Sequence, residues 1–137
     1  MMPHQVARLV MPIHVALELL PLGLFTEQHA PDLAAFLTVA QLAAEEAGRE
    51  DIVSAGADGA LTLLAMRDRV RDGKAWNVTT DERARLMRCV VTLDRWYRTT
   101  TTSRWVRALR RATELADAAM ARGAGRLDLI SEAPQCQ

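Results

Sequence analysis

The sequence predicts an all-α protein, a single-domain bundle of four or five helices that ends in a long antiparallel helical hairpin. Half of the residues are hydrophobic, mainly Ala, Leu and Val, whereas aromatic residues amount to 4%. Gly and Pro are sparse, and this composition is typical of packed helices rather than of a β-sandwich or barrel. The 137 residues are enough to bury a core without disulfides or a metal. We therefore expect one domain over residues 1–125.

The first helix is expected to begin at Pro12 and to end at Pro21. Proline suits the first turn of a helix, and apolar residues follow at helical spacing, namely Ile13, Ala16, Leu17 and Leu20. The residue before a proline disfavours the α conformation. Residues 1–11 are therefore expected to form an N-terminal arm, or a separate turn of helix, ahead of this first helix.

A second helix is predicted to end at Gly48, a residue suited to the position after a helix. Thr26 and Pro31 both offer signals for its start. Its apolar residues form a broad stripe on one face. The stripe consists of Leu33, Phe36, Leu37, Ala40, Leu42, Ala43 and Ala44.

The third helix is predicted between Arg49 and Gly73, because acidic residues open the segment and basic residues close it, which complements the helix dipole. Gly56 and Gly59 lie in its interior, where each costs about 1 kcal/mol relative to Ala. They mark either a break near Asp58 or a close crossing with another helix, and the close crossing is favoured. The apolar face predicted for this helix consists of Val53, Ala57, Ala60, Leu61 and Leu64.

The last two helices are predicted to form the hairpin. The fourth has an N-cap at Thr80 and runs over residues 81–98, and the fifth starts after a cap between Thr101 and Ser103 and stops near Gly123. The four threonines of residues 99–102 favour a turn between them. The last residues, 126–137, are expected to form a flexible tail.

Both tryptophans of the hairpin, Trp96 and Trp105, fall on the inner faces of a helical wheel, so they are expected to pack in the core rather than on a binding surface. On the fourth helix the inner positions are Leu86, Cys89, Val90, Leu93, Trp96 and Tyr97. On the fifth they are Trp105, Val106, Ala108, Leu109, Ala112, Leu115, Ala116, Ala119 and Met120.

The charges are unevenly placed along a chain of zero net charge. Residues 1–66 contain two basic and eight acidic residues, a balance of −6, so residues 67–137 carry +6. Between residues 83 and 111 there are nine arginines and one acidic residue. The predicted partner-binding residues are the outward arginines Arg83, Arg88, Arg95, Arg98, Arg104, Arg107, Arg110 and Arg111.

Three interpretations of these arginines are open. They can form a solvated face in the product of a GC-rich bacterial genome, which the single Lys against sixteen Arg indicates. They can bind the phosphate backbone of a nucleic acid. They can pair with acidic groups of a protein surface, including the acidic N-terminal half of the same chain or of a second copy.

No catalytic, cofactor or metal site is predicted. The chain has no GxSxG, GxxxxGK[ST] or GxGxxG motif. His14 and Glu18 have the i, i+4 spacing of half a metal site, but a simple surface contact between them is favoured. Cys89 is expected in the core and Cys136 in the tail, with no disulfide pattern, which suits a reducing compartment. Apolar stretches are interrupted and no signal peptide is recognised, so no membrane association and a cytoplasmic location are expected.

By elimination, the sequence favours a small cytoplasmic bacterial accessory or regulatory protein, of a kind also carried by phages and plasmids, that acts by protein–protein interaction without catalysis. A homodimer is expected, because the acidic half of one copy complements the basic half of another. The alternative is a DNA-binding transcriptional regulator that uses the arginine-rich face of the hairpin.

Overall fold

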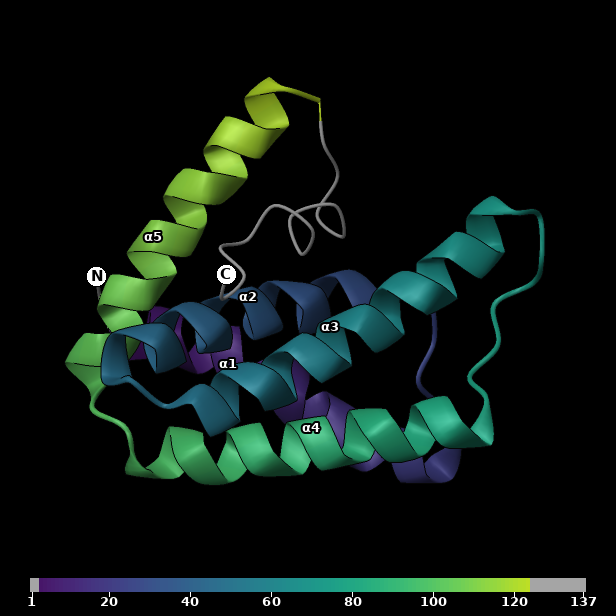
Figure 1. The fold of residues 1–137 in the computed structure, drawn as a ribbon, viewed down its shortest axis with the longest axis horizontal. Helices are drawn as coiled ribbons and strands as arrows, with labels where there is room; N and C mark the ends of the chain where they lie inside the picture. The colour runs from purple at the N-terminus through teal and green to yellow at the C-terminus, as the bar shows by residue number, and fades with distance from the viewer. Residues whose placement is uncertain (1–2, 124–137) are drawn as a thin grey trace.

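The structure is a computed structural model that describes the backbone of residues 3–123 and the side chains of residues 13–123. These residues form five α-helices and no strand: α1 (Pro3–Leu22), α2 (Ala30–Ala47), α3 (Glu50–Arg71), α4 (Thr80–Thr99) and α5 (Thr102–Ala121) (Figure 1). The predicted all-α single domain is confirmed. The predicted tail, 126–137, lies outside the described residues. None of the described helices is long and apolar enough to cross a lipid bilayer.

Helix α2 is the centre of the bundle. It packs against α3, α5 and α1, and α4 closes the bundle by packing against α3 and α1. The predicted stripe of α2 is buried throughout, and so are the polar side chains of Thr38 and Gln41 on the same helix. The Thr38 hydroxyl donates to the Ala34 carbonyl oxygen at 3.1 Å. Burial on every side explains why α2 shows a broad apolar band rather than a narrow stripe.

Helix α1 runs without a break through Pro12, so the predicted separation of residues 1–11 as an arm is wrong for the described part of that segment. A proline inside a helix removes one backbone hydrogen bond and costs about 3 kcal/mol. Ile13, Ala16 and Leu20 of the following turns are fully buried. Burial of large aliphatic side chains, at roughly 1.5–3 kcal/mol each, offsets the cost of the proline.

The glycines of α3 lie at close crossings, as favoured from the sequence, and α3 is continuous through both. A Cβ atom on Gly59 would lie 2.5 Å from Sγ of Cys89 in α4, and one on Gly56 would lie 2.9 Å from Cγ of Gln41 in α2. In the predicted apolar face of α3, Val53 and Ala60 are buried and Ala57 and Leu64 are half-buried, but Leu61 is 62% exposed. The buried face is centred on the glycines and continues with Leu63 and Met66.

The threonine stretch is a turn, as predicted. The hydroxyls of Thr99 and Thr100 both donate to the Trp96 carbonyl oxygen at 2.9 Å, and Thr101 is the residue before α5. At the other end of α4 the N-cap is Thr79 rather than Thr80. The cap lies at residue 79 because a capping box needs Glu three positions later, and Glu82 occupies that position.

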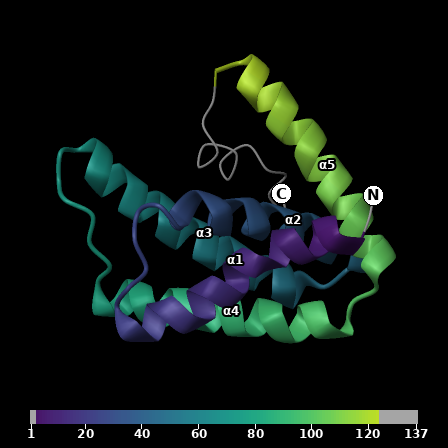
Figure 2. The ribbon, with the colours of Figure 1, turned by 180° about the vertical axis from the view of Figure 1, so that it is seen from behind.

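Helices α4 and α5 reverse the chain direction at this turn and form the hairpin-like end of the bundle. Trp105 lies beside the turn, with ring centroids 5.5 Å from Trp96, 5.2 Å from Tyr97 and 5.7 Å from Phe36 of α2. Trp96 and Trp105 are both buried, so their predicted core role is confirmed. Beyond the turn, α5 packs against α2 and α1 and rises away from α4 (Figures 1 and 2).

Candidate functional site

The predicted arginine face divides into arginines that pair with acidic groups and arginines without a partner. Arg107 donates through Nε to Glu46 Oε1 at 3.1 Å and through Nη2 to the same oxygen, and Arg104 Nε lies 3.6 Å from it. Glu46 belongs to the last turn of α2. Arg98 donates through Nε to Asp94 Oδ2 at 3.1 Å, one turn earlier on α4. These contacts use the acidic groups of the same chain, which was one of the three interpretations.

The charge on Glu46 is fixed by this contact. Its pKa is lowered from the ordinary value of 4.5, first by the hydrogen bond from Arg107 and then by the nearby positive charges of Arg107 and Arg104. The lowered pKa keeps the carboxylate ionised to a lower pH than an isolated Glu, and the contact joins α2 to α5. Arg85 makes a second link between the two halves of the chain, because it donates to Asp81 at 2.9 Å and to Asp58 of α3 at 3.3 Å.

The other predicted arginines have no hydrogen bond or ion pair within the described part of the chain, namely Arg83, Arg88, Arg95, Arg110 and Arg111. They do not form one continuous surface. Arg83 lines a pocket at the N-terminal end of α4, whereas Arg88 and Arg95 are exposed further along that helix. Arg110 and Arg111 are exposed on α5, and this helix runs at an angle to α4 and away from it (Figure 2).

Helix α5 carries a row of side chains that the bundle covers only in part. The row, which we call the α5 seam, consists of Val106, Leu109, Thr113, Ala116 and Met120. Their spacing alternates between three and four residues, the spacing of the contact positions in a coiled coil. Val106, Leu109 and Ala116 are half-buried, Thr113 is exposed and Met120 is 63% exposed.

The exposure of the α5 seam corrects the predicted inner face of the fifth helix. Trp105, Ala108 and Ala119 are buried, but Met120 is not, and the remaining predicted positions are half-buried. The reason is the course of α5, which leaves the bundle after its first turns (Figure 1). A helical wheel shows which side of a helix is apolar but contains no information on how far along the helix a neighbour reaches.

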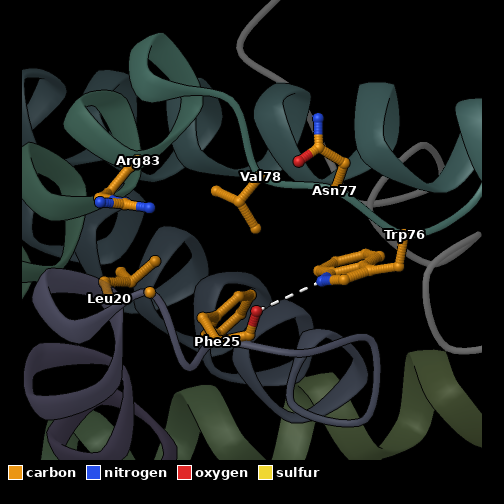
Figure 3. Close-up of a pocket in the computed structure, with 7 residues that line it drawn as sticks. Leu20, Phe25, Trp76, Asn77, Val78 and Arg83 are labelled. Carbon is orange, nitrogen blue, oxygen red and sulfur yellow. Dashed lines mark hydrogen bonds between the residues drawn. The ribbon is translucent and has the colours of Figure 1, made fainter.

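A pocket of about 220 Å³ lies where the α1–α2 connection meets the α3–α4 connection and the first turn of α4 (Figure 3). Trp76 closes one side and donates from Nε1 to the Phe25 carbonyl oxygen at 3.3 Å. The ring of Trp76 is tilted against that of Phe25, with centroids 6.3 Å apart. The lining residues are Leu20, Gly23, Phe25, Trp76, Asn77, Val78 and Arg83.

An ion pair holds in place the α3–α4 connection, whose residues Trp76, Asn77 and Val78 line this pocket. Arg69 of α3 donates to both carboxylate oxygens of Glu82, at 2.6 and 2.7 Å, and to the carbonyl oxygen of Asn77 at 2.7 Å. Glu82 also accepts from the backbone N–H of Thr79 at 3.0 Å. The hydrogen bonds from Arg69, above all, lower the pKa of Glu82 despite its burial. The backbone on either side of Val78 is thereby fixed.

His14 and His29 are the histidines whose side chains the structure describes. His14 lies 4.0 Å from Asp94, on α4, and the contact predicted between His14 and Glu18 is not formed. His29 accepts from the backbone N–H of Thr26 at 2.9 Å, through Nδ1, just before α2. No group of three or more His, Cys, Asp or Glu residues that could hold a metal ion occurs in the described part of the chain. The Cys89 thiol is buried, which raises its pKa to about 12.

Sequence reasoning missed the pocket and the α5 seam for different reasons. Trp76 and Phe25 are 51 residues apart, and nothing in either local pattern indicates that they meet. The apolar residues of the seam, Val106, Leu109, Ala116 and Met120, were assigned to the core, and Thr113 was not considered. The chain is an all-α five-helix bundle over the described residues. Comparison with protein-family models, curated proteins and solved structures finds no match for it.

Proposed function

We propose that this protein acts through protein–protein contact, without catalysis, and that the contact surface is the α5 seam. The proposal is based on one observation: an amphipathic helix that leaves its own bundle with Met120 63% exposed at the end of a coiled-coil row. Apolar residues at this spacing gain free energy when a second helix covers them. The accessory or regulatory role expected from the sequence is consistent with such a contact.

The occupant we propose is a second copy of the chain, with the two α5 helices antiparallel. Arg110 and Asp117 lie beside the α5 seam on the same edge, one heptad apart, and neither has a partner among the described residues. An antiparallel pair places Arg110 of one copy opposite Asp117 of the other, at two symmetric positions. A parallel pair would place the two copies of Arg110, and likewise of Asp117, on opposite sides of the helix pair, so neither residue would meet an opposite charge.

The same register matches the seam residues by size. With the two-fold axis between Thr113 and Ala116, Leu109 packs against Met120 of the second copy, and Thr113 packs against Ala116. Thr113 already donates its hydroxyl to the Leu109 carbonyl oxygen at 2.9 Å, so covering it leaves no new unpaired donor. The predicted homodimer therefore gains a specific interface in place of the general attraction between an acidic and a basic half.

Light scattering after size-exclusion chromatography tests this proposal on the full chain. Met120→Glu places a charge in the α5 seam and should abolish the dimer. Ala118→Glu is the matched control, because Ala118 is exposed on the opposite side of the same helix and the charge added is the same. A monomeric unmodified chain, or equal effects of the two variants, would contradict the proposal.

Nucleic-acid binding stays the second candidate, because Arg88 and Arg95 are exposed on α4 without a partner among the described residues. Its support is reduced by the pairing of Arg98, Arg104 and Arg107 with carboxylates. The test is binding of a labelled DNA duplex at low salt. A loss of affinity in the Arg88→Gln/Arg95→Gln variant, together with a steep salt dependence, would favour this candidate.

A further inference from the structure

We infer that the pocket between Trp76 and Arg83 binds a small aromatic carboxylate. The inference is independent of the α5 seam, because the pocket lies at the N-terminal end of α4 and at the C-terminal end of α1. Three features support it: a charged group without a partner, an aromatic wall, and a volume that suits one ring.

Arg83 supplies the charge. It is half-buried and, among the described residues, it is the one charged side chain that lines the pocket. No hydrogen bond or ion pair joins its guanidinium to another described residue. A planar guanidinium binds a carboxylate through two parallel hydrogen bonds, so this is the ligand group that Arg83 is best suited to bind.

The presence of Arg83 in the pocket is not explained by a role in capping the C-terminal end of α1. The guanidinium lies beside the end of α1, since a Cβ atom on Gly23 would be 3.5 Å from Nη2 of Arg83. Two carbonyl groups of that helix end already accept hydrogen bonds, Leu20 from Gly23 N–H at 3.2 Å and Leu19 from Leu24 N–H at 3.0 Å. Gly23 has a φ of 71°, which this type of helix end requires. The helix end is thus formed without Arg83.

The rings of Trp76 and Phe25 form the wall for the apolar part of the ligand. Their tilt and the hydrogen bond from Trp76 to the Phe25 backbone fix them relative to each other (Figure 3). The pocket volume of about 220 Å³ lies below the range of roughly 300–1,000 Å³ found for drug-sized ligands. The space therefore fits a one-ring molecule and is too small for a nucleotide. Asn77 lies at the rim, and its side-chain amide points away from the other lining residues (Figure 3).

Nuclear magnetic resonance titration of the full chain with benzoate tests the inference. The probe is read at the indole N–H of Trp76, which the Trp76→Phe variant identifies among the three tryptophans. Benzoate should move this resonance saturably. Benzamide has the same ring and no charge, and it should bind at least about tenfold more weakly, as expected from loss of charge-assisted hydrogen bonds.

Two variants separate recognition of the carboxylate from general effects. Arg83→Gln should weaken benzoate binding to the level of benzamide while leaving benzamide binding unchanged. Arg88→Gln removes an exposed arginine of the same helix and should change neither. Equal affinities for benzoate and benzamide, unchanged benzoate binding in Arg83→Gln, or no saturable shift at Trp76 would overturn the inference. If Arg83→Gln does not fold, the comparison of benzoate with benzamide on the unmodified chain decides the question.

Discussion

Replacing Gly59 by Ala should destabilise the bundle, although Ala is the better helix former. The added methyl group would lie 2.5 Å from Sγ and 3.2 Å from Cβ of Cys89, which is buried in α4. Atoms in van der Waals contact are about 3.5–4 Å apart, so the Cys89 side chain must rotate or α3 and α4 must separate. Overpacking of this kind costs about 1–3 kcal/mol, and the helix propensity of Ala returns about 1 kcal/mol. We expect a net loss of up to about 2 kcal/mol.

A double-mutant cycle with Cys89→Ala isolates the cause. Without the sulfur atom, Gly59→Ala should range from neutral to about 1 kcal/mol stabilising, because the helix propensity then dominates. Gly56→Ala is the control: its methyl group would meet Gln41, not Cys89, so its effect should be the same in both backgrounds. Urea unfolding followed by circular dichroism gives the free energies of unfolding. If Gly59→Ala stabilises the unmodified chain, or if its effect does not depend on Cys89, the close crossing is not present.

Four further outcomes are expected. Trp105→Ala should cost about 3–5 kcal/mol in urea unfolding. Trp105→Phe should cost less, because it keeps an aromatic ring against Phe36 and removes an Nε1 that has no hydrogen-bond partner; equal losses would contradict the packing of this ring. The lowered pKa of Glu82 contributes stability that is present above the unfolded pKa of about 4.3 and is lost as pH falls through the folded pKa. The Glu82→Gln variant should therefore melt at a lower temperature than the unmodified chain at neutral pH, and the two melting temperatures should converge only in acid. In a Cys136→Ser background, the buried Cys89 should react with a thiol reagent at pH 8 only after unfolding, and prompt reaction would contradict its burial. Thr113→Leu should strengthen the dimer in a light-scattering concentration series by adding an apolar contact to the α5 seam, and an unchanged dissociation constant would argue against that seam.

The helices and most of the core could be predicted from the sequence because local patterns determine them. Caps, glycines after helix ends and the apolar spacing of α4 all indicate their positions directly. The close crossing of α3 was predicted from its glycines, but they were not counted in its apolar face. Gly59 lies in the buried face and Leu61 lies outside it. The predicted break before Pro12 was wrong, because the cost of this proline is local, whereas the burial that offsets the cost comes from packing against other helices.

The candidate site was less predictable, since partners of a side chain depend on the tertiary fold. Arg107 and Arg95 look alike on a helical wheel, yet Glu46 lies opposite one and no described residue pairs with the other. The pocket requires Trp76 and Phe25 to meet across 51 residues. Charge balance did predict that acidic and basic halves of the chain attract, and the structure shows that part of this attraction is satisfied within one chain.

The most direct test of the proposed interface is a charge exchange measured by sedimentation equilibrium. The unmodified chain should give a mass of twice 15.2 kDa at the higher concentrations of the series. Arg110→Asp and Asp117→Arg should each weaken the dimer, because each places like charges opposite one another in the antiparallel pair. The variant with both changes should recover the affinity of the unmodified chain. Failure of the double variant to recover, or single variants as tightly dimeric as the unmodified chain, would contradict antiparallel pairing through α5.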